Sequence, residues 1–118
     1  MHRPSRVAEQ IRAILSDSIR DEVRDPRVGF VTLTEVDLSP DLKQARVFVS
    51  LLGSQADRDA AVEALNHAAA FLRTLLARRA RLKYTPALRF VSDDTLERGS
   101  RVEQIIQGLH TDEPDGAA

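Results

Sequence analysis

The fold is decided by residues 29–51, GFVTLTEVDLSPDLKQARVFVSL. Residues 29–36 are rich in β-branched and aromatic side chains and predict a strand. Turn-forming residues follow at 37–41, and apolar side chains then alternate with polar ones from 44 to 51. Such alternation predicts a second strand with one face on a core and the other toward water.

Helical periodicity lies on both sides of this strand pair. Residues 5–24 repeat apolar side chains at helical spacing, with Ser5 as the expected N-cap and Pro26 closing the segment. After Gly53, a second apolar stripe runs without interruption to residue 76 and predicts one continuous helix. Arg79 would point into this stripe, so the helix is expected to fray near 78–80 or Arg79 to extend its charge to water.

Residues 88–91 predict a third strand, and residues 94–109 predict a last helix opened by a capping box. The expected element order is α-β-β-α-α-β-α, with two helices in the segment after Gly53, and it predicts a two-layer α+β domain, with helices on one face of a three-stranded sheet. The length of 118 residues suits a single domain, expected over 1–110, with an acidic, disordered tail over 111–118. No apolar run approaches the ~20 residues of a membrane span, so a cytoplasmic protein is expected.

The charges are unevenly distributed along the chain, although the net charge is only −1. Between Glu63 and Asp93 there are six cations and no anion: Arg73, Arg78, Arg79, Arg81, Lys83 and Arg89. Helical geometry places Arg73, Arg78 and Arg81 opposite the apolar stripe. This cationic segment is either a solvated surface or a polyanion-binding surface, and its composition alone does not decide between them.

Catalytic chemistry has little support in the sequence. The absence of cysteine excludes a disulfide scaffold and a thiolate site, and the three histidines are scattered without metal-ligand spacing. The Asp93-Asp94 pair is interpreted as helix capping, and no glycine-rich phosphate loop occurs. We therefore expect no enzyme activity, no catalytic or metal site and no cofactor.

Nucleic-acid binding fits the element order better. The order matches a type II KH domain, but the GxxG loop that clamps phosphates in KH domains is absent, and Ala68-Ala69-Ala70 stands in its place. Phe48, on the polar side of its strand, could stack a base. Its burial under a neighbouring element is the favoured expectation.

Residues 25–50, DPRVGFVTLTEVDLSPDLKQARVFVS, resemble the signature of the bacterial ribosome-binding factor A family. The resemblance covers roughly residues 3–109. It continues at Arg6-Val7, Leu72-Arg73, Arg81-Leu82-Lys83, residues 86–90, Asp93 and Gly99.

This resemblance implies a single KH-like domain that binds 16S rRNA in the free small (30S) ribosomal subunit. It also implies a role in late maturation, including 5′-end processing, that matters most for growth in the cold. The family replaces the GxxG loop with a helix–kink–helix containing Ala-x-Gly. That element corresponds here to Ala68, Ala69 and Ala70, where alanine replaces the glycine and favours straightness by about 1 kcal/mol.

We therefore expect a monomer without catalytic action that neutralises rRNA phosphates with one cationic surface. Two alternatives are a general KH-like protein acting on other RNAs and an interaction module without an RNA partner. The expected RNA-binding residues are Arg73, Arg78, Arg81 and Lys83, with Arg3 and Arg6 as secondary candidates.

Overall fold

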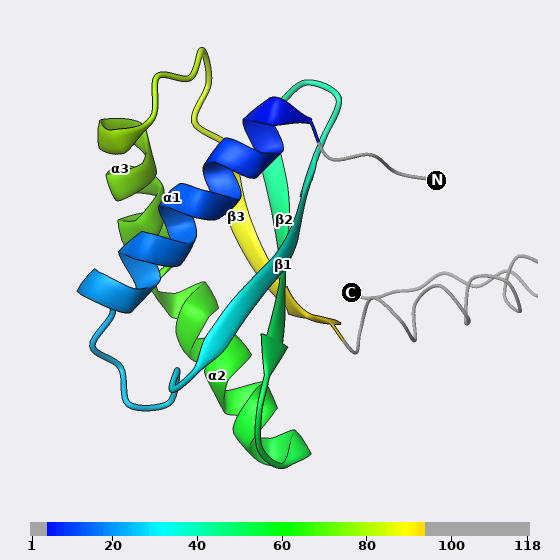
Figure 1. Ribbon diagram of the computed structural model, residues 1–118, viewed down its shortest axis with the longest axis vertical. Helices are drawn as coiled ribbons and strands as arrows, with labels where there is room; N and C mark the ends of the chain where they lie inside the picture. The colour runs from blue at the N-terminus through cyan, green and yellow to red at the C-terminus, as the bar shows by residue number, and fades with distance from the viewer. Residues whose placement is uncertain (1–4, 94–118) are drawn as a thin grey trace, which may run out of the picture.

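A computed structural model describes residues 5–93 of the chain (Figure 1). Arg3, the last predicted helix over 94–109 and the tail over 111–118 lie outside these residues. The elements are, in order, α1 (Arg6–Glu22), β1 (Val31–Leu38), β2 (Gln44–Leu51), α2 (Gln55–His67), α3 (Ala69–Arg79) and β3 (Ala87–Ser92).

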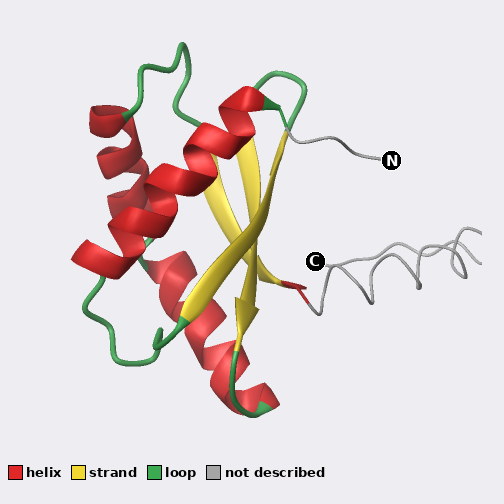
Figure 2. Cartoon of the chain, viewed as in Figure 1, coloured by secondary structure: helices red, strands yellow, loops and turns green. Residues whose placement is uncertain are grey.

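The three strands form one sheet in the order β1-β2-β3, with β1 and β2 antiparallel and β2 and β3 parallel. All three helices lie on the same side of this sheet (Figure 2). The two-layer α+β architecture predicted from the sequence is confirmed over the described residues, and it matches the type II KH-like order.

A capping hydrogen bond sets the start of α1, and a change in backbone conformation sets its end. Ser5 is the N-cap, and its Oγ accepts a hydrogen bond of 3.0 Å from the backbone N–H of Ala8. Val23 adopts extended backbone angles, so the helix ends at Glu22, two residues before the predicted end. The buried residues of α1 repeat at helical spacing: Ala8, Ile11, Leu15, Ser18 and Ile19.

The first strand starts at Val31, two residues later than predicted, because residues 25–30 form a turn in which Gly29 has φ +54°. The β1–β2 register shifts between Leu33 and Glu35, which marks a β-bulge. The bulge allows Leu33 and Val36, three residues apart, both to be buried. A regular strand would turn them to opposite faces.

The continuous helix that periodicity alone favours is not formed, because the helical segment divides at Ala68, where φ is −89° and ψ is 2°, into the two central helices of the expected element order. The buried side chains of α2 are Ala61, Ala64 and Leu65, and those of α3 are Leu72, Leu75 and Leu76. Burying each leucine contributes about 1.5–3 kcal/mol, which exceeds the propensity of alanine for a straight helix. We attribute the break to this demand for burial on both sides of Ala68.

Just before the break, Asn66 joins α2 to β3. Its Nδ2 donates to the carbonyl oxygen of Phe90 at 2.9 Å, and its Oδ1 accepts from the N–H of Phe90 at 2.8 Å. Both polar groups of the Phe90 backbone are therefore bonded by one side chain. The ring of Phe90 is buried in the core.

We expect Asn66→Ala to lower the free energy of unfolding by about 1–3 kcal/mol, because two partly buried backbone groups lose their partner. Urea denaturation followed by circular dichroism measures this change. The neighbouring exposed His67 provides a control, and His67→Ala should change the value by less than about 0.5 kcal/mol. Equal stabilities of the two variants would contradict the role of Asn66.

The turn after α1 is held by an ion pair between Asp25 and Arg27. Nη2 of Arg27 lies 2.8 Å from Oδ2 of Asp25, and the backbone N–H of Arg27 donates to Oδ1 at 3.0 Å. The side-chain hydrogen bond from Arg27, followed by the backbone one, lowers the pKa of Asp25 from 3.8 to about 2. The carboxylate therefore stays ionised in mild acid.

Because the folded pKa of Asp25 is the lower one, this pair stabilises the fold above about pH 4, and the stabilisation is lost as the pH falls toward 2. We expect an NMR titration of the Asp25 carboxyl carbon to give a midpoint near 2. Arg27→Gln should move that midpoint up toward the ordinary value. An unchanged midpoint would show that Arg27 does not cause the shift.

Candidate nucleic-acid interface

One end of the molecule brings together several cationic segments. The last turn of α3, the loop at 80–86, the β1–β2 turn and the start of α1 lie at this end, at the top of Figure 1. The start of β3, directly after the loop, is joined to the turn by a hydrogen bond of 2.9 Å from the N–H of Ala87 to the carbonyl of Lys43. The expected RNA-binding residues of the described chain belong to α1, α3 and this loop.

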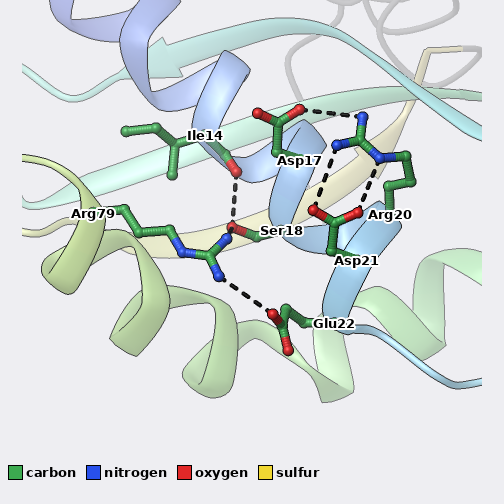
Figure 3. A network of polar contacts seen from close by, with 7 residues as sticks. All are labelled: Ile14, Asp17, Ser18, Arg20, Asp21, Glu22 and Arg79. Atoms are coloured by element: carbon green, nitrogen blue, oxygen red, sulfur yellow. Dashed lines mark hydrogen bonds and ion pairs between the residues drawn. The ribbon is translucent and has the colours of Figure 1, made fainter.

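Arg79 is directed toward α1 (Figure 3). Its Nη1 donates to Oγ of Ser18 at 2.9 Å, and its Nη2 lies 3.3 Å from Oε2 of Glu22. Ser18 is fully buried and donates in turn to the carbonyl of Ile14 at 2.8 Å. The helix α3 continues to Arg79, and the guanidinium of Arg79 contacts Ser18 and Glu22 of α1. Arg79 therefore contributes to the packing of α3 against α1.

A second ion-pair group lies on another side of the same part of α1 (Figure 3). Arg20 contacts Asp17 at 3.2 Å and Asp21 at 3.0 Å. The hydrogen bond and the charge of Asp21, together with the charge of Asp17, raise the pKa of Arg20. This part of the exposed α1 surface therefore holds one cation against two carboxylates.

Arg73 holds the α3–β3 loop. Its Nε and Nη2 donate to the carbonyl oxygen of Thr85 at 3.1 and 2.8 Å. Such a forked contact requires the planar guanidinium of arginine. The structure thus gives Arg73 a positioning task that the sequence pattern did not indicate.

Arg78, Arg81 and Lys83 are exposed and form no ion pair within residues 5–93. Arg78 also lies in the last turn of α3, where a cation interacts favourably with the helix dipole. Arg6, the first residue of α1, is exposed at the same end of the molecule. We call Arg78, Arg81 and Lys83 the basic end.

Arg89 does not join the basic end. In β3 it follows Leu88 and precedes the buried Phe90, and it pairs in register with Arg46 of β2. Alternation therefore directs Arg89 to the sheet face opposite the helices. The six cations of this segment are divided among anchoring of the loop, packing of α3 on α1, the sheet face opposite the helices and the basic end.

Sequence reasoning missed Tyr84 and Lys43 at this end of the molecule. The Tyr84 ring is exposed, and the ammonium groups of Lys43 and Lys83 lie 5.8 and 5.7 Å from its centroid. The adjacency of Lys83 and Tyr84 was the available signal, whereas Lys43 is brought near by folding.

Phe48, by contrast, is only 4% exposed, so it cannot stack a base without rearrangement, and the expectation that it is covered is confirmed.

Within the described part of the chain, no three histidine, cysteine or acidic residues are grouped closely enough to bind a metal ion. Nor does any helix in residues 5–93 have the length and apolar character needed to cross a bilayer. The chemistry that the described interface offers is cationic and aromatic.

Comparison with known proteins identifies similar chains. The model of the ribosome-binding factor A family matches residues 3–106. The ribosome-binding factor A of Desulforamulus reducens is 39% identical over 112 residues, which cover 95% of this chain and 93% of the relative. That of Halorhodospira halophila is 49% identical over 105 residues, covering 88% and 83% of the two chains.

Solved structures agree with these sequences. The crystal structure of ribosome-binding factor A from Thermus thermophilus has a TM-score of 0.68 at 28% identity, covering 77% of this chain and 97% of that one. A Thermus thermophilus homology model fitted into a cryo-EM map of a 30S–RbfA complex has a TM-score of 0.62 at 30% identity, with 74% and 91% covered.

The different contacts of Arg73 and Arg78 predict different effects on stability. Arg73→Gln should lower the free energy of unfolding by about 1 kcal/mol, since the Thr85 carbonyl loses its two donors. Arg73→Lys should also destabilise, because an ammonium keeps the charge without the fork. Arg78→Gln should change the value by less than about 0.5 kcal/mol. Urea denaturation compares the three variants, and full stability of Arg73→Lys would contradict the anchoring role.

Proposed function

The chain belongs to the ribosome-binding factor A family, and we propose that it binds the free small (30S) ribosomal subunit through 16S rRNA and assists late maturation. The action is non-catalytic, takes place in the cytoplasm and includes support of 5′-end processing of the rRNA. The observation that carries this proposal is the basic end, where Arg78, Arg81 and Lys83 are exposed without ion-pair partners among residues 5–93.

The binding surface that we propose gives different roles to the cations that the sequence predicted. Arg78, Arg81 and Lys83 contact phosphates directly, and Arg6 at the start of α1 is a secondary contact. Arg73 positions the loop through its hydrogen bonds to Thr85, and it contributes its positive charge to the proposed binding surface. Arg3, outside the described residues, remains a secondary candidate, and the break at Ala68, the first residue of the Ala68-Ala69-Ala70 segment, orients α3.

Phosphate contacts position a protein on RNA without reading its sequence. Specificity then depends on the shape of the RNA surface that places several phosphates opposite the basic end at once. A ligand shifts an equilibrium only by its difference in affinity for the two states. The protein therefore favours the rRNA conformation that fits this surface and disfavours its competitors. Such assistance is most valuable in the cold, where misfolded RNA rearranges slowly.

The test is co-sedimentation of purified 30S subunits with the protein over a range of salt concentrations. The triple variant Arg78→Gln, Arg81→Gln and Lys83→Gln should bind more weakly. Its plot of log affinity against log salt should be shallower by about 2–3, given about 0.7–0.9 for each lost phosphate contact. The basic end would be the wrong surface if this variant bound like the unmodified protein.

The chain offers a matched control with the same loss of charge. Arg12, Arg20 and Arg27 each pair with a nearby carboxylate, so the triple variant of these residues to Gln should retain most 30S binding. Equal weakening of both variants would indicate a nonspecific charge effect. If free single-stranded RNA bound as tightly as 30S subunits, a general RNA-binding function would replace the proposed one.

A further inference from the structure

Tyr84 differs from the other aromatic residues of the described chain. Its side chain is 47% exposed and has two ammonium groups near its ring. Phe30 and Phe71 are also exposed, but no cation from residues 5–93 lies over either ring, whereas Phe48 has Arg46 nearby but is buried. Tyr84 alone among them combines exposure with neighbouring cations.

The backbone around this ring is held from two sides. On the loop side, Arg73 bonds the carbonyl of Thr85, the residue after Tyr84. On the turn side, the carbonyl of Lys43 accepts from Ala87 at 2.9 Å, and the N–H of Lys43 donates to Oδ1 of Asp41 at 3.0 Å. The side chains of Tyr84, Lys43 and Lys83 thus project from a positioned backbone.

Asp41 contributes to this positioning through its charge. Its Oδ1 accepts from the Ser39 hydroxyl at 2.7 Å as well as from the N–H of Lys43. The Ser39 hydrogen bond, followed by the Lys43 backbone one, lowers the pKa of Asp41. The carboxylate is therefore ionised at neutral pH, and it fixes the turn that presents Lys43.

An exposed ring with adjacent ammonium groups fits a nucleotide, whose base stacks on the ring while its phosphates contact the lysines. Substitution studies give base–aromatic stacking a worth of about 5- to 150-fold in affinity. An exposed lysine over a ring is worth about 2- to 5-fold. A base can therefore displace a lysine from the ring, and the flexible lysine then reaches a phosphate.

The geometry points to Tyr84, Lys43 and Lys83 as a site for one unpaired nucleotide of RNA. This inference rests on the proposed function and deepens it, because it adds a single-stranded element beside the phosphates bound by the basic end. The site accepts any base, since every base has a π face. It is separate from the Ala68 break between α2 and α3.

The chain has one tyrosine and no tryptophan, so selective tyrosine labelling gives NMR ring signals from Tyr84 alone. The probes are a hexa-adenylate RNA and an abasic strand of equal length and charge. We expect hexa-adenylate to shift the ring signals upfield and the abasic strand to leave them nearly unmoved. Equal shifts with both strands would overturn the inference.

Affinity measurements with variants complete the test. Tyr84→Leu should weaken hexa-adenylate binding about tenfold, Tyr84→Phe should stay within about twofold, and the preference over the abasic strand should vanish only in Tyr84→Leu. Phe71→Leu is the matched control, because Phe71 is also 47% exposed, and it should bind normally. Unchanged binding by Tyr84→Leu would overturn the stacking role.

The same proteins are then assayed for co-sedimentation with 30S subunits. If the unmodified protein binds 30S subunits while Tyr84→Leu matches it with every probe, the nucleotide site is refuted and the proposed function stands. If the unmodified protein fails to bind 30S subunits, the proposed function itself is refuted. Competition by poly-glutamate as effective as that by hexa-adenylate would assign the site to acidic peptides and overturn the inference.

Discussion

The packing of two helical segments on one sheet face is the constraint on which the rest of the structure depends. The leucines on both sides of Ala68 are buried, and we attribute the break between α2 and α3 to the packing of these side chains. The break sets the direction of α3, whose last residue then contacts α1 through Ser18. The loop that follows is consequently held at the same end of the molecule as the β1–β2 turn.

Local signals predicted most of the fold. The Ser5 cap and the alternation in β2 depend on neighbouring residues, and both match the structure, except that Phe48 on the polar side of β2 is buried. The division at Ala68 could not be predicted from periodicity, because the apolar stripe continues through it. The pairing of Asn66 with Phe90 was also inaccessible, since it joins residues 24 positions apart.

The candidate site shows the same distinction between local composition and folded arrangement. The sequence indicated a segment with six cations, but folding directs Arg79 to α1 and Arg89 to the open sheet face. Arg73 contacts a backbone carbonyl. A count of charges along the chain therefore overestimates the field available to a polyanion. What remains within residues 5–93 is a small group of unpaired cations on a protein of net charge −1, which suits shape-dependent binding to one RNA surface.

The contact of Asn66 with β3 has a further consequence for the behaviour of the protein in a crowded solution. In the order β1-β2-β3, β3 is an outer strand, and outer strands expose backbone groups that can template pairing with another chain. At Phe90 both the N–H and the carbonyl are already hydrogen-bonded by the side-chain amide of Asn66, which takes the place of a neighbouring strand. The sheet is thereby protected at this position against edge-to-edge growth between copies, the first step toward fibrous aggregates.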